Sequence, residues 1–279
     1  MNALKTTQLP ASGRHPLAGV SMTGAQIIVQ VLADEGVDVI FGYSGGAILP
    51  TYDAVFLYNE ASADSWPGGL ERKKMPLVVP ANEQGAGFMA AGYARATGKV
   101  GVCLVTSGPG ATNTVTPVRD SMADSVPMVV ICGQVPTTSI GTDAFQEADI
   151  TGITLPITKH SYFVRDVNDL PRIIKEAFHI ASTGRKGPVL IDIPKDVSAH
   201  KTTFHYPETV SLRGYNPTVM PNRLQVDKML KAIEQAEKPM ILAGGGVVYA
   251  DAGKELVEFA EKANIPVTTT LLGLSGFPS

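Results

Sequence analysis

Four short turns carry the residues of this sequence that are best suited to chemistry. They are the glycine-rich turn 42–46, the acidic segment 82–84, the turn 107–113 and the triple glycine Gly244, Gly245 and Gly246. Each turn follows a short apolar run that predicts a buried strand. In open parallel sheets, ligands bind beyond the carboxyl ends of the strands, where helix N-termini and unpaired amides converge. The sequence therefore predicts a ligand site built from such turns, with Glu83 as its carboxylate.

Each of these features also has a purely structural interpretation. Glycine permits positive φ in tight turns, and an acid such as Glu83 in the first turn of a helix complements the helix dipole. The glycine spacings match neither a Walker loop nor a strict GxGxxG fingerprint, so alone they do not indicate nucleotide binding. Both interpretations of Glu83, helix start and reactive carboxylate, stay open at this level.

Short apolar runs alternate with helical periodicity along most of the chain. This alternation predicts an α/β fold in which an open parallel sheet is flanked by helices. Strands are expected at 39–41, 77–79, 100–105, 128–132, 189–193, 240–243 and 267–269. Helices are expected at 23–35, 47–58, 82–98, 170–183, 226–236 and 254–263, with a further helix that ends near 124.

Breaks in this periodicity divide the chain into four parts. Residues 1–20 are polar and are expected to be a disordered tail, and residues 21–197 are expected to be the first domain. Proline and glycine accumulate over 198–223, which predicts a linker. The alternation restarts over 224–279 and predicts a second α/β domain that is not finished. The polar stretch 61–74 is expected to be a surface excursion.

Composition and charge exclude several classes of protein. A net charge of −3 and 44% hydrophobic residues indicate a folded chain without a basic surface for nucleic acid or membrane lipids. The two cysteines, Cys103 and Cys132, lie in apolar runs, which favours free thiols and a cytoplasmic location. The acid-free residues 1–20 leave a plastid or mitochondrial transit peptide as the minor alternative. The five histidines show no metal-binding spacing, so no metal held by protein ligands alone is expected.

Seven segments together resemble one known family. They read GYSGGAILP at 42–50, NEQGAGFMAAGYA at 82–94, TSGPGATN at 106–113, ICGQVP at 131–136, DAFQE at 143–147, KH at 159–160 and IDIPKDV at 191–197. In this order they are similar to the catalytic subunit of the acetolactate synthase (acetohydroxyacid synthase) family, which depends on thiamine diphosphate. The resemblance implies a thiamine diphosphate pyrimidine-binding domain up to Val197. It also implies that a central FAD-binding-type domain begins after the linker.

The resemblance implies a role for each candidate site residue. Glu83 occupies the position of the family's glutamate that touches the aminopyrimidine ring, where a carboxylate shares a proton with a ring nitrogen and favours the imino tautomer. Gly45 and Gly46 would let the backbone approach the cofactor closely. The other implied residues are Phe145 and Gln146 at the reaction site and cofactor, Lys195 at the substrate channel, and Arg185, Gly244, Gly245 and Gly246 at FAD.

The implied reaction condenses two pyruvate, or pyruvate with 2-oxobutyrate, with loss of CO2 in branched-chain amino acid biosynthesis. Lys195 is expected to attract the substrate carboxylate as a point charge. The family's G-D-G…N motif, which holds Mg2+ and the cofactor diphosphate, does not occur in this sequence. The Mg2+ ligands are therefore expected in an absent C-terminal half, and the chain alone is expected to be inactive. A homo-oligomer of at least two subunits is the expected assembly, and a regulatory subunit is a further candidate partner.

Two positions depart from the family pattern. Ser44 stands where proline is usual, and Asn82 stands where histidine is usual. Asparagine is a good N-cap, so the helix is expected to form, but a titratable neighbour of the cofactor is missing. Another thiamine diphosphate enzyme, such as pyruvate oxidase or a 2-oxoacid decarboxylase, and a noncatalytic half-enzyme stay open as alternatives. Glyoxylate carboligase is disfavoured because it lacks a glutamate at the position of Glu83.

Overall fold

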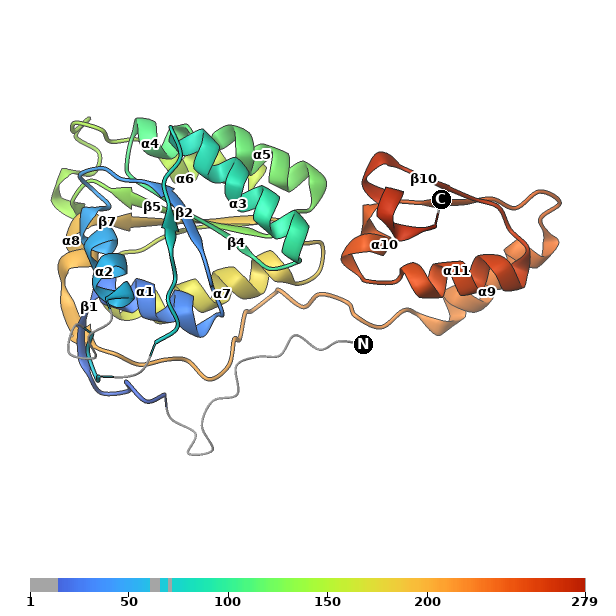
Figure 1. The fold of residues 1–279 in the computed structure, drawn as a ribbon, viewed down its shortest axis with the longest axis horizontal. Helices are drawn as coiled ribbons and strands as arrows, with labels where there is room; N and C mark the ends of the chain where they lie inside the picture. The colour runs from blue at the N-terminus through green and yellow to red at the C-terminus, as the bar shows by residue number, and fades with distance from the viewer. Residues whose placement is uncertain (1–14, 61–65, 70–71, 279) are drawn as a thin grey trace. The chain divides into compact units, whose positions relative to one another are not determined.

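The computed structural model describes residues 15–60, 66–69 and 72–278. Its internal contacts divide the chain into two compact units, Met1–Tyr215 and Asn216–Ser279. Each unit has its own parallel sheet and its own helices (Figure 1). The first unit carries Glu83 and most of the other predicted site residues.

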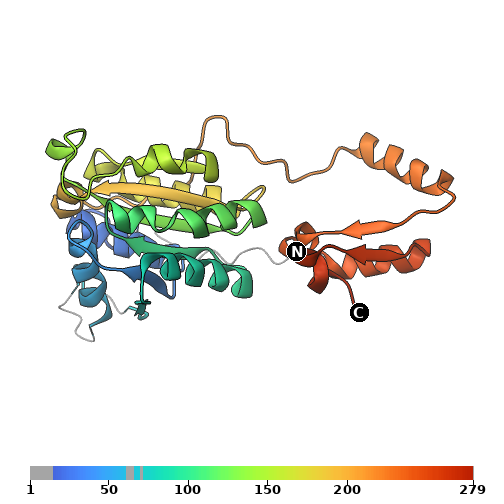
Figure 2. The same cartoon turned by 90° about the horizontal axis from the view of Figure 1, so that it is seen from above.

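A six-stranded parallel sheet forms the centre of the first unit (Figures 1 and 2). Its strands lie in the order β3-β2-β4-β5-β7-β6, and each neighbouring pair is parallel. They are β2 (Ile40–Tyr43), β3 (Leu77–Val78), β4 (Gly101–Val105), β5 (Met128–Gln134), β6 (His160–Phe163) and β7 (Pro188–Pro194). Every residue of β4, β5 and β7 is buried, as expected for strands covered on both faces. The predicted α/β fold with an open parallel sheet is confirmed.

Helices cover both faces of this sheet, as Figure 1 shows. One face carries α1 (Gly24–Asp34), α2 (Leu49–Asn59) and α7 (Leu170–Ser182), and the other carries α3 (Glu83–Thr97) and α5 (Val115–Asp124). The short elements are α4 (Pro109–Thr112), α6 (Ile150–Thr154), α8 (Lys195–Ala199), η2 (Thr137–Ser139), η3 (Leu155–Ile157) and η4 (Val167–Asp169). The two apolar faces of the sheet thus form two separate cores, and the turns that follow the strands meet at one edge.

Local sequence signals explain where the main helices begin and end. Helix α1 begins with a capping box in which Thr23 accepts the N–H of Gln26 (3.2 Å) and donates its own N–H to the Gln26 side chain (2.9 Å). Helix α3 has Asn82 as its N-cap and ends at Gly98, whose φ of 73° closes the helix in the left-handed region. Asn82 is the N-cap that the sequence predicts, and Thr23 and Gly98 lie at ends of the predicted helices 23–35 and 82–98.

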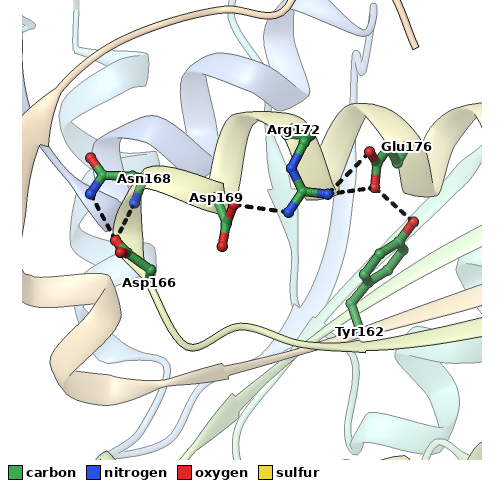
Figure 3. A network of polar contacts seen from close by, with 6 residues as sticks. All are labelled: Tyr162, Asp166, Asn168, Asp169, Arg172 and Glu176. Carbon is green, nitrogen blue, oxygen red and sulfur yellow. Dashed lines mark hydrogen bonds and ion pairs between the residues drawn. The ribbon is translucent and has the colours of Figure 1, made fainter. Parts of the chain in front are cut away.

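The edge strand β6 was not predicted, because its residues are mostly polar. Figure 3 shows how its Tyr162 is tied to α7: the hydroxyl donates to Glu176 (3.0 Å), and Arg172 donates to both oxygens of the same carboxylate (3.1 and 3.0 Å). Arg172 also donates to Asp169 (2.8 Å) at the start of the helix. A buried carboxylate with a cationic partner, rather than an apolar run, therefore holds this strand in place.

Residues 15–20 do not fit the predicted disordered tail. Leu17 is fully buried, and the N–H of Gly19 donates to the carbonyl of Phe204 (3.0 Å). The neighbouring strand β1 (Ser21–Thr23) pairs antiparallel with β8 (Lys201–Thr203). A few apolar side chains anchor this segment to the core. The average composition of residues 1–20 is polar and therefore does not reveal them. Residues 1–14 lie outside the described residues.

The predicted linker over 198–223 is wrong for its first part. Residues 198–215 belong to the first unit, with Phe204 in the core and Tyr206 packed against it. The Nζ of Lys159 donates to the hydroxyl of Tyr215 (2.9 Å), and that hydroxyl donates to the carbonyl of Thr183 (2.9 Å) at the end of α7. Single aromatic residues hold this stretch without helical or strand periodicity, so the sequence pattern missed it.

The predicted surface excursion over 61–74 also contains a buried residue. Trp66 is 2% exposed, and its indole Nε1 donates to Gln30 of α1 (2.9 Å). Its ring packs edge-on against Tyr58, with centroids 5.0 Å apart. The tryptophan therefore anchors this stretch to the core. Residues 61–65 and 70–71 lie outside the described residues.

The second unit pairs two short parallel strands. Its elements are α9 (Arg223–Gln235), β9 (Ile241–Ala243), α10 (Gly245–Tyr249), α11 (Gly253–Ala263), β10 (Val267–Thr269) and η5 (Leu271–Gly276). Helix α9 has no buried residue, and Leu224 on it is exposed. In the part of the chain that the structure describes, no helix is both long and apolar enough to cross a membrane.

Candidate active site

Glu83 opens helix α3 beyond the carboxyl end of strand β3. The side chain of Asn82 accepts the backbone N–H of Gly85 (2.8 Å), which makes Glu83 the first helical residue. One carboxylate oxygen, Oε2, accepts a hydrogen bond from Nδ2 of Asn113 (2.9 Å). The other, Oε1, accepts none from the described residues. The Glu83 carboxylate is therefore held in place through Oε2, and its Oε1 is available to a ligand.

Thr106 brings two glycine turns together beside Glu83. It follows strand β4, and its Oγ1 accepts the N–H of Ala47 (3.3 Å). A Cβ on Gly45 would lie 2.5 Å from Cγ2 of Thr106, closer than real Cβ atoms come to a neighbour. A Cβ on Gly110 would lie 2.6 Å from the same atom and 3.4 Å from Oε1 of Glu83. Close packing around one threonine thus requires glycine at both positions.

Gly46 differs from Gly45 in having open space where a side chain would point. A Cβ placed on Gly46 meets no atom within 4 Å. Gly46 and its neighbour Ser44 are both exposed. A ligand can therefore approach the backbone of Gly46 without meeting a side chain.

The segment that carries Phe145 and Gln146 lies against the turn after β4. Gln146 has a φ of 60°, and Gly108 has φ 55° and ψ −121°. A Cβ on Gly108 would lie 2.6 Å from the backbone oxygen of Gln146, so the two segments touch through their backbones. Phe145 is 88% exposed. The structure thus brings Gln146 to the turn that carries Gly110 and leaves the Phe145 ring in solvent.

Gly108→Ala is expected to lower the free energy of unfolding by about 1–3 kcal/mol, because an alanine there is strained and meets Gln146. Urea unfolding followed by the fluorescence of Trp66, the single tryptophan, measures this. Gly92→Ala is the matched control: Gly92 lies inside α3 with no atom near its added Cβ, so about 0.5–1 kcal/mol of stabilisation is expected. Equal effects of the two variants would contradict the prediction.

Lys195 is the first residue of α8, directly after strand β7. Its side chain is exposed and makes no hydrogen bond or ion pair with the residues that the structure describes. The next residue, Asp196, accepts the N–H of Thr137 (3.0 Å) in η2, which follows the neighbouring strand β5. Lys195 therefore lies at the same edge of the sheet as Glu83, and among the described residues its side chain makes no hydrogen bond or ion pair with Glu83 or Gln146.

Arg185 lies apart from this edge and has other partners. It precedes strand β7, and its guanidinium donates to Oγ of Ser125 (2.9 Å) and to the carbonyls of Met122 (3.0 Å) and Ala123 (3.1 Å). These groups form the C-terminal end of α5, where a cation is favourable. The structure does not bring Arg185 together with Glu83.

The triple glycine follows strand β9 of the second unit. Gly244 is the N-cap of the five-residue helix α10, which contains Gly245 and Gly246. A Cβ on Gly244 would meet only Oγ1 of Thr270, at 3.6 Å, and one on Gly246 would meet no atom within 4 Å. A Cβ on Gly245 would lie 3.1 Å from Cβ of Leu272, so the backbone of this turn is accessible at Gly244 and Gly246.

Two buried groups behind the site have raised pKa values. Burial raises the pKa of the Cys103 thiol to about 12, with Glu83 adding to the shift, so this thiol stays protonated at neutral pH. Burial raises the pKa of Asp192 on strand β7 to about 7, and Asp149 adds to that shift. The Nε2 of Gln134 donates to Oδ2 of Asp192 (3.1 Å).

Sequence reasoning did not single out Thr106, Asn113, Gln134 or Asp192. Thr106 and Asn113 lie in the motif TSGPGATN, and a polar residue directly after a buried strand is the signal that marks Thr106. Gln134 is the last residue of β5 and Asp192 lies inside β7, and because both strands are otherwise mostly apolar, the hydrophobic pattern does not indicate these two polar residues. Over the described ranges, no three His, Cys, Asp or Glu side chains form a group that could hold a metal ion.

Comparison with known proteins gives two matching family profiles. "Thiamine pyrophosphate enzyme, N-terminal TPP binding domain" matches residues 22–153. "Thiamine pyrophosphate enzyme, central domain" matches residues 226–279. The first match lies within the first unit of the structure, and the second match lies within the second unit.

Curated relatives match nearly the whole chain. Acetolactate synthase of Mycobacterium bovis is 51% identical over 257 residues, which are 92% of this chain and 39% of that protein. The acetolactate synthase large subunit of Corynebacterium glutamicum is 50% identical over 268 residues, 96% of this chain and 41% of that protein. The large subunit of Haemophilus influenzae is 49% identical over 260 residues, 92% of this chain and 43% of that protein.

The chain thus spans about two fifths of the length of these relatives. Two profiles of one family in sequence order, and relatives at 49% to 51% identity over at least 92% of the chain, agree with the parallel sheet that presents Glu83. The chain therefore belongs to the thiamine pyrophosphate enzymes, as a homologue of acetolactate synthase large subunits.

Proposed function

We propose that this chain forms the pyrimidine-binding side of the active site of an acetolactate synthase catalytic subunit. The proposed reaction condenses two pyruvate, or pyruvate with 2-oxobutyrate, with loss of CO2. The observation that carries the proposal is the Glu83 carboxylate, held at Oε2 by Asn113 and presenting Oε1 beside Gly110. An oxygen so placed can share a proton with a ring nitrogen of a bound ligand.

The residues around Glu83 fit the aminopyrimidine ring of thiamine diphosphate. Gly46 leaves its backbone open to a flat ring, and Gly110 keeps a side chain away from Oε1 of Glu83. When bound, the cofactor supplies the carbanion chemistry of the reaction. The contribution of this chain is to orient the ring and to hold a proton at Oε1 of Glu83, while Asn113 fixes the direction of the carboxylate.

Three further residues have proposed roles toward the substrate. Lys195, exposed at the carboxyl edge of the sheet, attracts the carboxylate of the 2-oxoacid as a point charge. Gln146 and its neighbour Phe145 line the reaction site next to the turn at Gly108. The backbone contact between Gln146 and Gly108 supports this placement of Gln146.

FAD and Mg2+ are also part of the proposal. The accessible backbone of Gly244 and Gly246, with Gly245 between them, fits the close approach of a FAD molecule. Arg185 fits a phosphate contact less well, because its guanidinium already donates to the end of α5. We place the Mg2+ ligands in a part of the enzyme outside this chain.

The proposed assembly is a homo-oligomer of at least two subunits in the cytoplasm, with a regulatory subunit as a further partner. Exposed apolar side chains of the first unit support an interface between copies, among them Phe56 on α2, Val79 after β3, and Phe88 and Met89 on α3. Both cysteines are buried and free, which suits a reducing compartment.

The test of the proposed function is product identity. The purified enzyme that contains this chain, supplied with pyruvate, thiamine diphosphate, Mg2+ and FAD, is expected to form acetolactate and to form acetohydroxybutyrate when 2-oxobutyrate is added. Omission of thiamine diphosphate is expected to abolish the product. Acetaldehyde or acetate as the main product would indicate a decarboxylase or an oxidase and would reject the proposal.

A further inference from the structure

Gln134, the last residue of strand β5, joins three parts of the carboxyl edge through one buried side chain. Its Nε2 donates to the backbone oxygen of Ala148 (2.9 Å) and to Oδ2 of Asp192 (3.1 Å). Its Oε1 accepts the N–H of Val135 (2.9 Å). Both ends of the amide are therefore in use, and loss of one partner would leave a buried polar group unpaired, which is unfavourable.

Asp192 is the group that orients this amide. It lies in strand β7 at the register position of Cys132 on one side and Phe163 on the other, and it is 2% exposed. Its Oδ2 accepts from Gln134, whereas its Oδ1 is buried and has no hydrogen-bond partner among the described residues. Burying a carboxyl group with one partner is costly, so an apolar residue would serve a core position better. The polar contact that Asp192 does make points to a role in holding Gln134.

Besides strands β5 and β7, Gln134 contacts a third part of this edge, the Gln146 segment, which we define as residues 141–149. Glu147 closes this segment on itself by accepting the N–H of Ala144 (2.9 Å), and Asp149 caps α6 by accepting the N–H of Gly152 (2.9 Å). Neither bond reaches the sheet. Among the described residues, the side-chain hydrogen bond from Gln134 to Ala148 is the one that ties the Gln146 segment to a strand.

We infer that Gln134 and Asp192 are positioning residues: the Asp192 carboxyl orients the Gln134 amide, which holds the Gln146 segment against the turn at Gly108. The catalytic consequence rests on the proposed function, because Gln146 acts in the reaction only if this edge is the active site. The structural consequence, a locally fixed Gln146 segment, does not depend on it.

Hydrogen exchange on matched variants of the full chain tests the structural consequence. Gln134→Met keeps the length of the side chain without its donor, Asp192→Leu keeps the volume without the acceptor, and Asp192→Asn keeps an acceptor oxygen. The first two are expected to raise amide exchange over 134–153 by about tenfold or more, while strand β4 keeps the protection of the parent chain. Asp192→Asn is expected to retain the protection of the parent chain in both places.

Exchange that rises equally across the first unit, or that stays unchanged over 134–153 in Gln134→Met, would overturn the inference. Should Asp192→Leu fail to fold, Gln134→Met alone decides the result. In the enzyme that contains this chain, Gln134→Met is expected to lower kcat for pyruvate about tenfold without weakening thiamine diphosphate binding, and Asp192→Asn is expected to preserve kcat. Local exchange with an unchanged kcat would reject the positioning role, whereas a parent enzyme that forms no acetolactate would reject the proposed function instead.

Discussion

Glu83→Gln, in the enzyme that contains this chain, is expected to lower the turnover of pyruvate on the order of a hundredfold or more. The amide keeps an oxygen that can accept from Asn113, so the start of α3 is expected to stay folded. What the amide loses is the ability to take up and release a proton at Oε1, and positioned acid–base groups commonly contribute a factor of this size. Steady-state acetolactate formation at saturating cofactor measures the effect.

The matched control for Glu83→Gln is Glu234→Gln. Glu234 is exposed on helix α9 of the second unit, so the same change of carboxylate to amide is expected to leave turnover as in the parent enzyme. Thermal unfolding of both variants separates a chemical effect from a loss of stability. A Glu83→Gln enzyme with unchanged turnover would remove Glu83 from the mechanism.

Asp192→Asn is expected to change how stability depends on pH. Asp192 has a pKa of about 7 in the folded chain, raised by burial from 3.8, so the folded state keeps a proton that the unfolded state releases between these values. The free energy of unfolding therefore falls as pH rises through this window, by about 1.4 kcal/mol per pH unit. Asparagine does not titrate, so the variant lacks this slope. Its stability relative to the parent chain is expected to rise by about 3 kcal/mol from pH 5 to pH 8.

Urea unfolding at pH 5 and pH 8, followed through the fluorescence of Trp66, checks this difference. Trp66 is buried in the first unit, so its signal reports the unit that contains Asp192. All other titrating groups are common to the two proteins and cancel in the comparison. Parallel stability curves for the parent chain and Asp192→Asn would show that Asp192 is ionised in the folded state at both pH values.

The apolar strands and capped helices of the first unit could be predicted because each is a local signal. Strands β4, β5 and β7 are nearly continuous apolar runs, and α3 has Asn82 and Gly98 at its ends. Strand β6 and residues 198–215 could not be predicted from the sequence, because ionic and aromatic contacts between residues far apart in the chain stabilise them. Tyr162 depends on Glu176, and Tyr215 depends on Lys159, and neither pair has a periodic pattern.

For the candidate site, too, the local features could be predicted and the contacts between distant residues could not. The turns after β2, β3 and β4 were expected to converge, and Gly45 and Gly110 do meet at Thr106, with Oε1 of Glu83 beside Gly110. The support behind them was not predictable, because the pairing of Gln134 with Asp192 requires the register of β5 against β7. A buried amide and a buried carboxyl each look like an exception within an apolar strand until the register joins them.

Thr106 also determines which substitutions Gly45 and Gly110 can accept. Gly45 and Gly110 belong to different turns, yet an added Cβ at either would meet Cγ2 of Thr106, at 2.5 and 2.6 Å. A side chain gained at either glycine therefore meets the side chain of Thr106, so the effects of substitutions at the three positions do not add. At Gly110, removal of Cγ2 would relieve the contact, because Cβ of Thr106 lies 3.6 Å from the added atom. At Gly45 the contact would remain, because Cβ of Thr106 itself lies 2.6 Å away. The three residues therefore form one epistatic unit, in which the side chain at residue 106 sets what each glycine position tolerates.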